Sequence, residues 1–367
     1  MTYDQQTLTD IARQFQIPQE ITQVAPLGDG FINDTFVVLT QASKRYILQR
    51  KNKNVFPDVP AMMDNILRVT SHIRRKVTEA GGDSEREVLT VIPALNGKPY
   101  YQDRDGEYWA VCLYIEQSVT FDRATTPSLA YKGGQGIGRF QTLLSDFHEP
   151  LAEVIKGFHN MRWRFTQWDE AVNADKAGRV AALSEEIGWI ESQRREMMDF
   201  QQMIESGEIP KRIAHNDTKI SNILFDDDGN VLCVIDLDTV MSNSSLCDFG
   251  DAIRSYTNTG AEDDPSLENV SMSMEMFTAY TEGYLSERHD TLTDSEKQWL
   301  AFSARFITFE QVLRFLMDYI DGDTYYKIAY PEHNLVRTRA QYRLLRSMEE
   351  QYPEMCRTVS DILSKHK

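Results

Sequence analysis

The spacing of apolar and polar residues changes its period between residues 116 and 125. Before this point the chain carries short β-type runs and two helical segments. The first has Leu8, Ile11, Ala12 and Phe15 at helical spacing and ends at Pro18, and the second runs from Val59 to about Ala80, with Pro60 suited to its first turn. The β-type runs form two pairs and cover residues 36–40, 45–49, 87–95 and 108–116. This pattern predicts a small β-rich N-terminal lobe with one prominent helix.

From about residue 125 onward, apolar residues recur three and four positions apart, which is typical of helices. The predicted helices cover residues 128–147, 166–205, 267–288 and 294–321. The sequence TDSE at Thr293–Glu296 forms a capping box ahead of the last helix, and short β-runs interrupt the helices once, at residues 213–240. We therefore expect an α+β protein with an N-lobe at residues 1–116, a C-lobe at residues 117–367 and a ligand site in the cleft between them.

The composition is that of a globular protein, with 41% hydrophobic and 26% charged residues. The 56 acidic residues outnumber the 39 basic ones, and the net charge of −17 argues against a nucleic-acid or anionic-membrane partner. No segment approaches 18 uninterrupted apolar residues, and the N-terminus lacks a basic leader segment, so we expect a cytoplasmic location. The four cysteines are dispersed and form no C-x-x-C pair, which favours buried thiols in a reducing compartment.

The strongest chemical signal is AHNDTKISNILF, at Ala214–Phe225. The apolar run after Asn222, the turn residues DDDGN and a second apolar run ending at Asp236 predict a β-hairpin. Folding this hairpin back places Asn222 and Asp236 side by side, next to Asp217. An amide oxygen and a carboxylate are ligands that suit Mg²⁺, which also takes water and substrate phosphates.

Two further side chains of this loop complete the set needed for phosphoryl transfer. Asp217 lies on the loop, where it is able to orient a substrate hydroxyl, and Lys219 adds a cation for phosphate oxygens. The alternative interpretation is a polar turn leading into a surface hairpin. The position of Asp236 at the far end of the hairpin disfavours that alternative.

In this loop and the hairpin that follows it, the chain resembles a known family. HNDTKISN at His215–Asn222 resembles the catalytic loop H-x-D-x-K-x-x-N of the protein-kinase-like fold. VIDLD at Val234–Asp238 resembles the metal-binding strand end of the aminoglycoside and choline phosphotransferase branch of that fold. Within this branch the chain is most similar to bacterial N-acetylhexosamine 1-kinases, over essentially its whole length. The segments that carry this similarity are PLGDGFINDTFVV, RYILQ, RIAHNDTKISNIL, IDLDTVM, DFGDAIR and YPEHNLVRTR.

The resemblance implies a bilobal protein-kinase-like fold and a kinase that depends on ATP and Mg²⁺. The substrate would be N-acetylglucosamine or N-acetylgalactosamine, and the product a sugar 1-phosphate. Asp217 would orient the sugar hydroxyl, and Lys219 would contact the transferred phosphate. Asn222 and Asp236 would hold the magnesium ion.

The resemblance also implies residues for the sugar. Arg314 and Tyr325 match positions that line the sugar pocket of the hexosamine kinases, and Phe31 stands where a histidine is expected near the sugar. Spacing alone favours a different interpretation of Arg314. Glu310 and Asp318 lie four residues before and after it, which is typical of a surface charge stripe on a helix.

For the nucleotide, Gly28 and Gly30 lie at a turn between two predicted strands, where backbone amides are able to approach ATP phosphates. Asn33 occupies the place of the third glycine of protein kinases, so the phosphate cover differs from theirs. LYIEQ at residues 113–117 is expected to be the hinge between the lobes. The residues expected to meet adenine there are Tyr114, Ile115 and Glu116.

One departure from the kinase pattern concerns Gln49. The fold usually places a lysine at this position, where it pairs the ATP phosphates with a helix glutamate. Arg50, Lys51 and Lys53 are the candidates to replace that lysine, although strand alternation directs Arg50 to the face opposite Gln49.

Three other motifs have structural interpretations. Asp248 in CDFGD lies beyond the hairpin, so we expect it to anchor the backbone of the loop and not to hold the metal. His215 is expected to pack under the same loop. GGQGIGRF at residues 133–140 lacks the preceding strand and the Lys-Ser/Thr of a phosphate-binding loop, and it indicates close helix packing.

Two alternative functions stay open at this stage. A kinase of an aminoglycoside or amino-alcohol acceptor would suit the acidic composition. A catalytically inactive, ligand-binding pseudokinase would explain Gln49, but Asp217 and Lys219 are present. In each case the expected partners are ATP and a small molecule, and we expect a monomer or a weak dimer.

Overall fold

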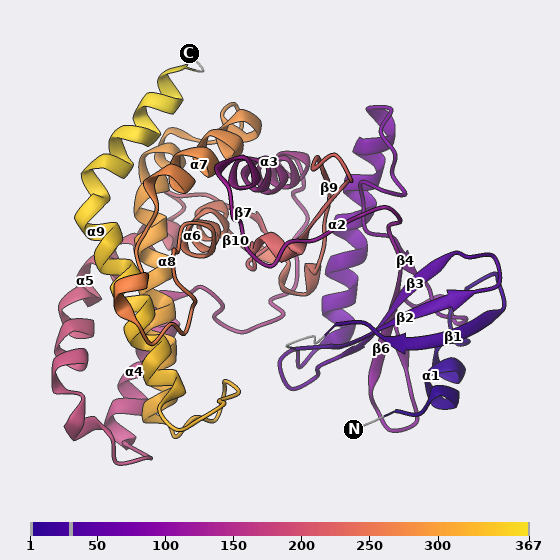
Figure 1. The fold of residues 1–367 in the computed structure, drawn as a ribbon, viewed down its shortest axis with the longest axis horizontal. Helices are drawn as coiled ribbons and strands as arrows, with labels where there is room; N and C mark the ends of the chain where they lie inside the picture. Colours follow the sequence, from indigo (N-terminus) through magenta and orange to yellow (C-terminus); the bar gives the residue numbers. More distant parts are fainter. Residues whose placement is uncertain (1–2, 29–31, 366–367) are drawn as a thin grey trace. The chain divides into compact units, whose positions relative to one another are not determined.

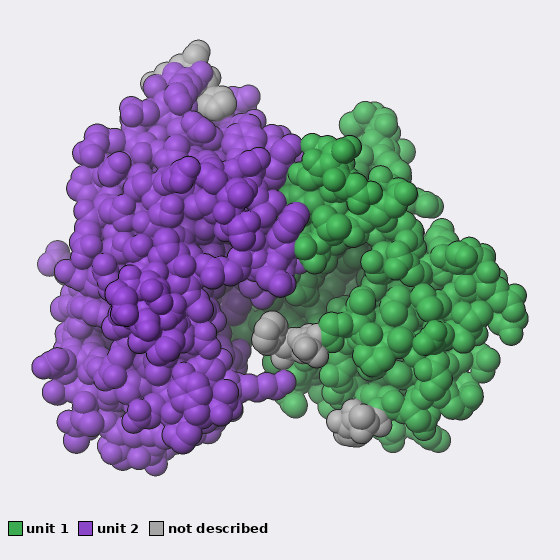
Figure 2. All heavy atoms as spheres, viewed as in Figure 1, with its two compact units in different colours: residues 1–120, 146–156, 222–242 green, residues 121–145, 157–221, 243–367 purple. Residues whose placement is uncertain are grey.

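The computed structural model describes residues 3–28 and 32–365, and Figure 1 shows a mixed α+β chain, which confirms the predicted fold class. The chain divides into two compact units, coloured separately in Figure 2. Unit 1 contains residues 1–120, 146–156 and 222–242. Unit 2 contains residues 121–145, 157–221 and 243–367. The predicted N-lobe thus lies within unit 1, which also takes in the hairpin that follows Asn222.

An antiparallel sheet forms the centre of unit 1, in the order β1-β2-β3-β6-β4 with β5 paired to β6. Its strands are β1 Ile21–Pro26, β2 Asp34–Thr40, β3 Arg45–Lys51, β4 Val91–Ile92, β5 Tyr101–Gln102 and β6 Tyr108–Leu113. Alternate residues such as Val38, Leu48 and Val111 are buried in one core with helix α1, Gln5–Ala12. The strand predicted at residues 87–95 shrinks to β4, because residues 83–87 form a hydrogen-bonded turn and Pro93 has no N–H to donate.

Helix α2, Val59–Glu79, confirms the predicted helix of the N-lobe. Asp58 caps it by accepting a hydrogen bond from the Ala61 amide (2.9 Å), and Pro60 lies in its first turn. The predicted hairpin is also present, with β8 Ile223–Phe225 paired antiparallel to β9 Val231–Val234. Asn65 of α2 donates to the carbonyls of Val240 (3.0 Å) and Ala152 (2.9 Å), so the helix is tied to the chain that leaves the hairpin.

Unit 2 is mainly helical. Its helices are α3 Pro127–Leu143, α4 Met161–Ala174, α5 Ser184–Ser206, α6 Ser245–Tyr256, α7 Met274–Arg288, α8 Asp294–Ile320 and α9 His333–Lys365. Two short strands, β7 Lys211–Ala214 and β10 Met241–Ser244, pair with each other. Short 3₁₀ turns cover Val180–Ala182 and Leu267–Asn269 in unit 2 and Leu237–Thr239 in unit 1, and a further turn, Ile220–Asn222, spans the point in the sequence where unit 2 passes into unit 1. Among the described residues, no helix is both long and apolar enough to cross a membrane.

The helix predictions for unit 2 hold in part. The capping box of α8 is present, because Thr293 and Glu296 bond each other's backbone amides. The single helix predicted at residues 166–205 is wrong. Asp175 adopts a left-handed conformation (φ 40°) that ends α4, and α5 begins only at Ser184. Helices α6 and α9 are additional to the prediction, and α6 is almost wholly buried.

Helices α3 and α7 pack with their backbones in close approach, and glycines make this possible. A Cβ atom on Gly134 would lie 2.2 Å from the Tyr280 carbonyl oxygen, and one on Gly283 would lie 1.9 Å from the Tyr131 carbonyl oxygen. No side chain fits at either position without separating the helices. The interpretation of GGQGIGRF as a helix-packing motif is therefore confirmed.

We predict that Gly134→Ala destabilises the protein by about 1–3 kcal/mol, because the new methyl group overpacks the contact between α3 and α7. The matched control is Gly188→Ala on the exposed face of α5, where nothing lies within 4 Å of the added atom. This control should stabilise the protein by about 0.5–1 kcal/mol, since alanine favours helix more than glycine does. Thermal unfolding midpoints measure both effects, and a Gly134→Ala midpoint at or above that of the wild type would contradict the packing analysis.

Candidate active site

The loop that follows β7 in unit 2 is anchored by the carboxylate of Asp248. Asp248 accepts the backbone N–H groups of His215 (2.9 Å) and Asn216 (2.7 Å), and Gln141 donates its side-chain amide to the same carboxylate (2.7 Å). Burial raises the pKa of Asp248, while the hydrogen bonds from the loop pull it in the opposite direction. The prediction that Asp248 anchors the loop backbone is confirmed.

The next residues of this loop are fixed in the same way. The Asp217 amide donates to Nδ1 of His215 (3.2 Å), and the Thr218 amide donates to the Asp251 carboxylate (2.9 Å). His215 is fully buried, so its predicted structural role is confirmed. Asn216 has a left-handed backbone (φ 66°), which is costly for a residue other than glycine. Four consecutive amides therefore have fixed partners around the residue that carries the candidate catalytic carboxylate.

The structure brings the two predicted catalytic side chains together. The Lys219 ammonium lies 3.1 Å from the Asp217 carboxylate. Their side chains are 45% and 27% exposed, respectively, so both are accessible to a substrate. A carboxylate and a cation in this pairing are able to hold a hydroxyl and a phosphoryl group at the same place.

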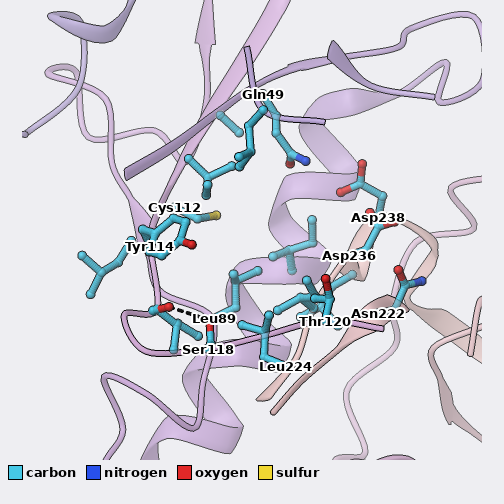
Figure 3. Close-up of a pocket in the computed structure, with 18 of the residues that line it drawn as sticks. Gln49, Leu89, Cys112, Tyr114, Ser118, Thr120, Asn222, Leu224, Asp236 and Asp238 are labelled. Atoms are coloured by element: carbon cyan, nitrogen blue, oxygen red, sulfur yellow. Dashed lines mark hydrogen bonds between the residues drawn. The ribbon is translucent and has the colours of Figure 1, made fainter. Parts of the chain in front are cut away.

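Unit 1 contains a cavity of about 500 Å³, a size typical of small-molecule sites. Figure 3 shows its lining, which comes from β3, α2, β6 and the hairpin. The apolar lining residues include Ile47, Met63, Ile66, Leu89, Ala110, Cys112, Leu224 and Leu237. Burial raises the pKa of the Cys112 thiol to about 11, so this group stays uncharged in the cavity. The cavity suits a flat, apolar ring at one end and polar groups at the other.

The predicted hinge residues differ in their positions around this cavity. Tyr114 and Ile115 line it, and the Ser118 hydroxyl donates to the Ile115 carbonyl (2.6 Å). Glu116 does not line the cavity, since its carboxylate pairs with Arg45. Contact of these three residues with adenine stays a prediction.

At the polar end, Asn222 and Asp236 meet as the hairpin prediction requires. The Ile235 amide donates to the Asn222 carbonyl (2.9 Å), which joins the start of β8 to the end of β9. Figure 3 shows the Asn222 and Asp236 side chains at the same end of the cavity. Asp236 has a left-handed backbone (φ 59°), a strained conformation that is frequent at functional sites.

This donor set fits a magnesium ion. In the described ranges, residues 3–28 and 32–365, no group of three or more His, Cys, Asp or Glu side chains is arranged to hold a metal. Asn222 and Asp236 offer one amide oxygen and one carboxylate, the few protein ligands that Mg²⁺ takes when phosphates and water complete its shell. Their role as metal ligands stays a prediction.

Lys51 supplies the cation that is missing at Gln49. Strand alternation places both residues on the same face of β3, and both line the cavity. The Lys51 ammonium lies 2.7 Å from the Asp238 carboxylate and 2.8 Å from the side-chain oxygen of Gln49. A cation–carboxylate pair is thus present, but its carboxylate follows the hairpin and does not come from α2. Lys51 was predictable from the sequence as the replacement for a lysine at Gln49, because residues two positions apart in a strand lie on the same face.

The predicted phosphate-cover residues have mixed positions. Gly28 lines the cavity with a left-handed backbone (φ 67°). Asn33 lies outside the lining; its side chain donates to Asp238 (2.7 Å) and accepts from the Asn52 amide (3.1 Å). Gly30, also predicted here, and Phe31, predicted to lie near the sugar, are outside the described residues.

In unit 2, the structure brings together the two residues that the resemblance assigns to the sugar. The Arg314 guanidinium lies 5.9 Å from the ring centre of Tyr325, 5.5 Å from that of Tyr326 and 5.6 Å from that of Phe158. These distances are within the range of cation–π contacts. Tyr325 is 61% exposed, which leaves one aromatic face open beside the cation.

The interpretation of Arg314 as part of a surface charge stripe is wrong, because its two expected acidic partners are buried elsewhere. Glu310 pairs with His159 (2.6 Å) and Arg164 (2.9 Å). Asp318 accepts the backbone amides of residues 324–326 and so fixes the loop that carries Tyr325. Sequence spacing gave no signal for either set of partners.

Three solved structures share the fold of this chain at low sequence identity. Spectinomycin phosphotransferase APH(9)-Ia, in complex with ADP and spectinomycin, has a TM-score of 0.61 at 14% identity, covering 95% of this chain and 100% of that chain. An aminoglycoside phosphotransferase from Alicyclobacillus acidocaldarius has a TM-score of 0.59 at 12% identity, covering 96% and 98%. The amicoumacin kinase hAmiN, in complex with AMP-PNP, Ca²⁺ and Ami, has a TM-score of 0.58 at 15% identity, covering 95% and 94%. These likenesses confirm the protein-kinase-like fold.

The model of the phosphotransferase enzyme family, APH, matches residues 23–288, more than half of the chain. The matched region includes the sheet of unit 1, the loop with Asp217, the hairpin and Asp248. The chain therefore belongs to the phosphotransferase enzyme family, and the reaction that it catalyses is phosphoryl transfer to an acceptor hydroxyl.

Proposed function

We propose that this phosphotransferase transfers the γ-phosphoryl group of ATP to the anomeric hydroxyl of a 2-acetamido hexose, N-acetylglucosamine or N-acetylgalactosamine. The observation that carries the proposal is the charge around Arg314. This guanidinium and three aromatic rings form the proposed acceptor site, and the nearest acidic side chains on its helix are consumed by other partners. Among the described residues, the site therefore offers a cation and aromatic faces, and the two acidic side chains that flank Arg314 on its helix are bound by other groups.

The local charge separates the proposed acceptor from the main alternative. A cationic aminoglycoside or amino alcohol would meet the positive guanidinium of Arg314, and the nearby Glu310 carboxylate already pairs with His159 and Arg164, so the approach of a second cation costs binding free energy. A neutral acetamido sugar instead gains hydrogen bonds from the guanidinium and stacks on an aromatic face. The net charge of −17 attracts cations to the protein as a whole, but contact specificity follows the local site.

The cavity of unit 1 suits ATP. Its apolar lining accepts the adenine ring, and the Lys51 ammonium lies at the polar end, where it would meet phosphate oxygens. The magnesium ion, held by Asn222 and Asp236, would neutralise charge on the phosphates. Because Lys51 provides the cation, Gln49 no longer argues for an inactive pseudokinase.

Within this proposal, Asp217 orients the sugar hydroxyl and accepts its proton as the oxygen attacks the γ-phosphorus. Lys219 stabilises the charge that develops on the transferred group. The rigid backbone of the loop around Asn216 and Thr218 preorganises Asp217, so most of the rate gain would come from positioning.

We predict that the enzyme, given ATP and Mg²⁺, releases ADP with N-acetylglucosamine or N-acetylgalactosamine and much less with aminoglycosides or choline. Phosphorus NMR of the product should show coupling to the anomeric proton, because the proposed acceptor is the hydroxyl at C1. Coupling to a C6 methylene, or turnover only with cationic acceptors, would refute the proposed function.

We also predict different consequences for the two carboxylates Asp236 and Asp248. Asp236→Ala should abolish activity or raise the Mg²⁺ concentration needed for half-maximal activity, because it removes a proposed metal ligand. Asp248→Ala should lower the thermal unfolding midpoint, because it leaves the buried amides of His215 and Asn216 without an acceptor. A magnesium titration and a melting curve for each variant separate these outcomes, and the reverse pattern would show that the metal ligand has been misassigned.

For Lys51, we predict that Lys51→Met lowers kcat/KM for ATP about tenfold or more, because charge-assisted hydrogen bonds are worth about 1.5–3 kcal/mol. Lys53→Met is the matched control, since Lys53 is 42% exposed and pairs with Glu107. Gln49→Lys should give no gain, because it adds a second ammonium beside Lys51. Steady-state kinetics with ATP varied test all three, and an equal loss in both methionine variants would rule out a specific role for Lys51.

A further inference from the structure

His159 directly precedes Asn160, the N-cap residue of helix α4, and it contacts the loop of unit 2 that carries Asp217. Its Nε2 lies 3.2 Å from the carbonyl oxygen of Asn216, the residue directly before Asp217. Its Nδ1 lies 2.6 Å from the carboxylate of Glu310. His159 is only 6% exposed and Glu310 only 1% exposed, so water does not compete for these contacts.

The two partners determine the protonation of the ring. A backbone carbonyl and an ionised carboxylate are both acceptors only, so each ring nitrogen of His159 must donate a proton. His159 is therefore an imidazolium, and Arg164 stabilises the same carboxylate of Glu310 from the other side (2.9 Å). Burial opposes the charged form, but the Glu310 carboxylate outweighs it and the pKa of His159 is raised.

The Asn216 carbonyl and the Asp217 amide belong to one planar peptide group. His159 holds the oxygen of this group, and Nδ1 of His215 accepts from its N–H (3.2 Å). The peptide is thus fixed from both sides. Because the plane of the peptide sets the direction in which Asp217 leaves the backbone, a rotation of this group would displace the carboxylate.

The strained backbone of Asn216 makes this restraint necessary. Its φ angle of 66° is costly for a non-glycine residue, and its own amide and side chain are also held, by Asp248 (2.7 Å) and Asn243 (3.0 Å). The bond to His159 adds a restraint on the third polar group of Asn216, its carbonyl.

We propose that His159 is a positioning residue of the phosphoryl transfer: its imidazolium holds the Asn216–Asp217 peptide and so aims the Asp217 carboxylate at the acceptor hydroxyl. The proposal rests on the role assigned to Asp217 in the proposed function. It does not depend on which hydroxyl compound is the acceptor.

The charged groups around His159 set its pH dependence. Glu310 of α8 and Asp251 of α6 act on His159 directly, and Arg164 of α4 and Arg314 of α8 act on the Glu310 carboxylate. The buried thiol of Cys247, also on α6, is uncharged because burial raises its pKa. Since the pKa of His159 is raised in the folded protein, its contribution is complete below its ordinary value near 6.5 and is lost as the pH rises through the raised value.

Two substitutions separate the contacts of the two ring nitrogens. His159→Gln places an amide N–H close to the former Nε2, within reach of the Asn216 carbonyl. His159→Asn places an N–H close to the former Nδ1 and cannot reach that carbonyl. We expect His159→Gln to keep most of kcat. His159→Asn should lower kcat about tenfold or more and leave KM for ATP unchanged, because a small misplacement of a reacting group is enough to cause a loss of this size. We expect the wild type to lose kcat as the pH rises through the raised pKa of His159, and we expect His159→Gln to lack this loss.

Controls keep the outcomes distinct. His72→Gln removes another histidine–carboxylate pair, with Asp146 (3.0 Å), and should leave kcat and its pH profile unchanged. Asp217→Asn tests the proposed function itself, and near wild-type turnover in that variant would refute the assignment on which the inference rests. Suppose that Asp217→Asn is inactive. If the two His159 variants then lose kcat equally, or if they lose activity at alkaline pH as the wild type is expected to do, His159 has a structural role only and the inference fails. Unfolding midpoints measured on the same samples show whether a loss of kcat merely follows a loss of stability.

Discussion

The loop that carries Asp217 depends on two hydrogen bonds, which the buried Asp248 carboxylate accepts from the consecutive backbone amides of His215 and Asn216. A loop rich in polar groups is able to lie in the interior of unit 2 only if its amides find acceptors there. Asp248 supplies the first acceptor, and Asp251, one helical turn later on α6, accepts the amide of Thr218. The helix that carries both aspartates thus serves as a template for the loop, and Asp217 receives its position from that template.

Charge buried in matched pairs is the second constraint, and it recurs in each unit. Lys51 pairs with Asp238 in unit 1, and His159 and Arg164 pair with Glu310 in unit 2. Removing one member of a buried ion pair such as Lys51–Asp238 costs about 3–5 kcal/mol, because the other charge stays buried without its counter-charge. These pairs therefore tie the lining of the unit 1 cavity and the loop with Asp217 to the stability of the surrounding core.

Much of the fold and of the candidate site follows from local sequence. The alternation of Phe36 to Thr40, the capping box at Thr293 and the turn residues between β8 and β9 each have a local physical cause. The hairpin is the most informative of these features, because its pairing alone brings Asn222 and Asp236 to the same end. The packing role of the glycines in α3 was likewise predictable, because their motif lacks the preceding strand and the lysine that a phosphate-binding loop requires.

The sequence by itself was enough to predict a candidate set of chemical groups, since Asp217, Lys219, Asn222 and Asp236 lie close together along the chain or across one short hairpin. Only the tertiary structure decided which buried charges meet. Asp238 pairs with Lys51 across 187 positions, and Glu310 pairs with His159 across 151. Such contacts leave no periodic trace in the sequence, because they depend on how whole elements pack and not on the spacing within one element. For the same reason, Glu310 and Asp318 look like the partners of Arg314 on a helix diagram, whereas burial against other elements gives them different ones.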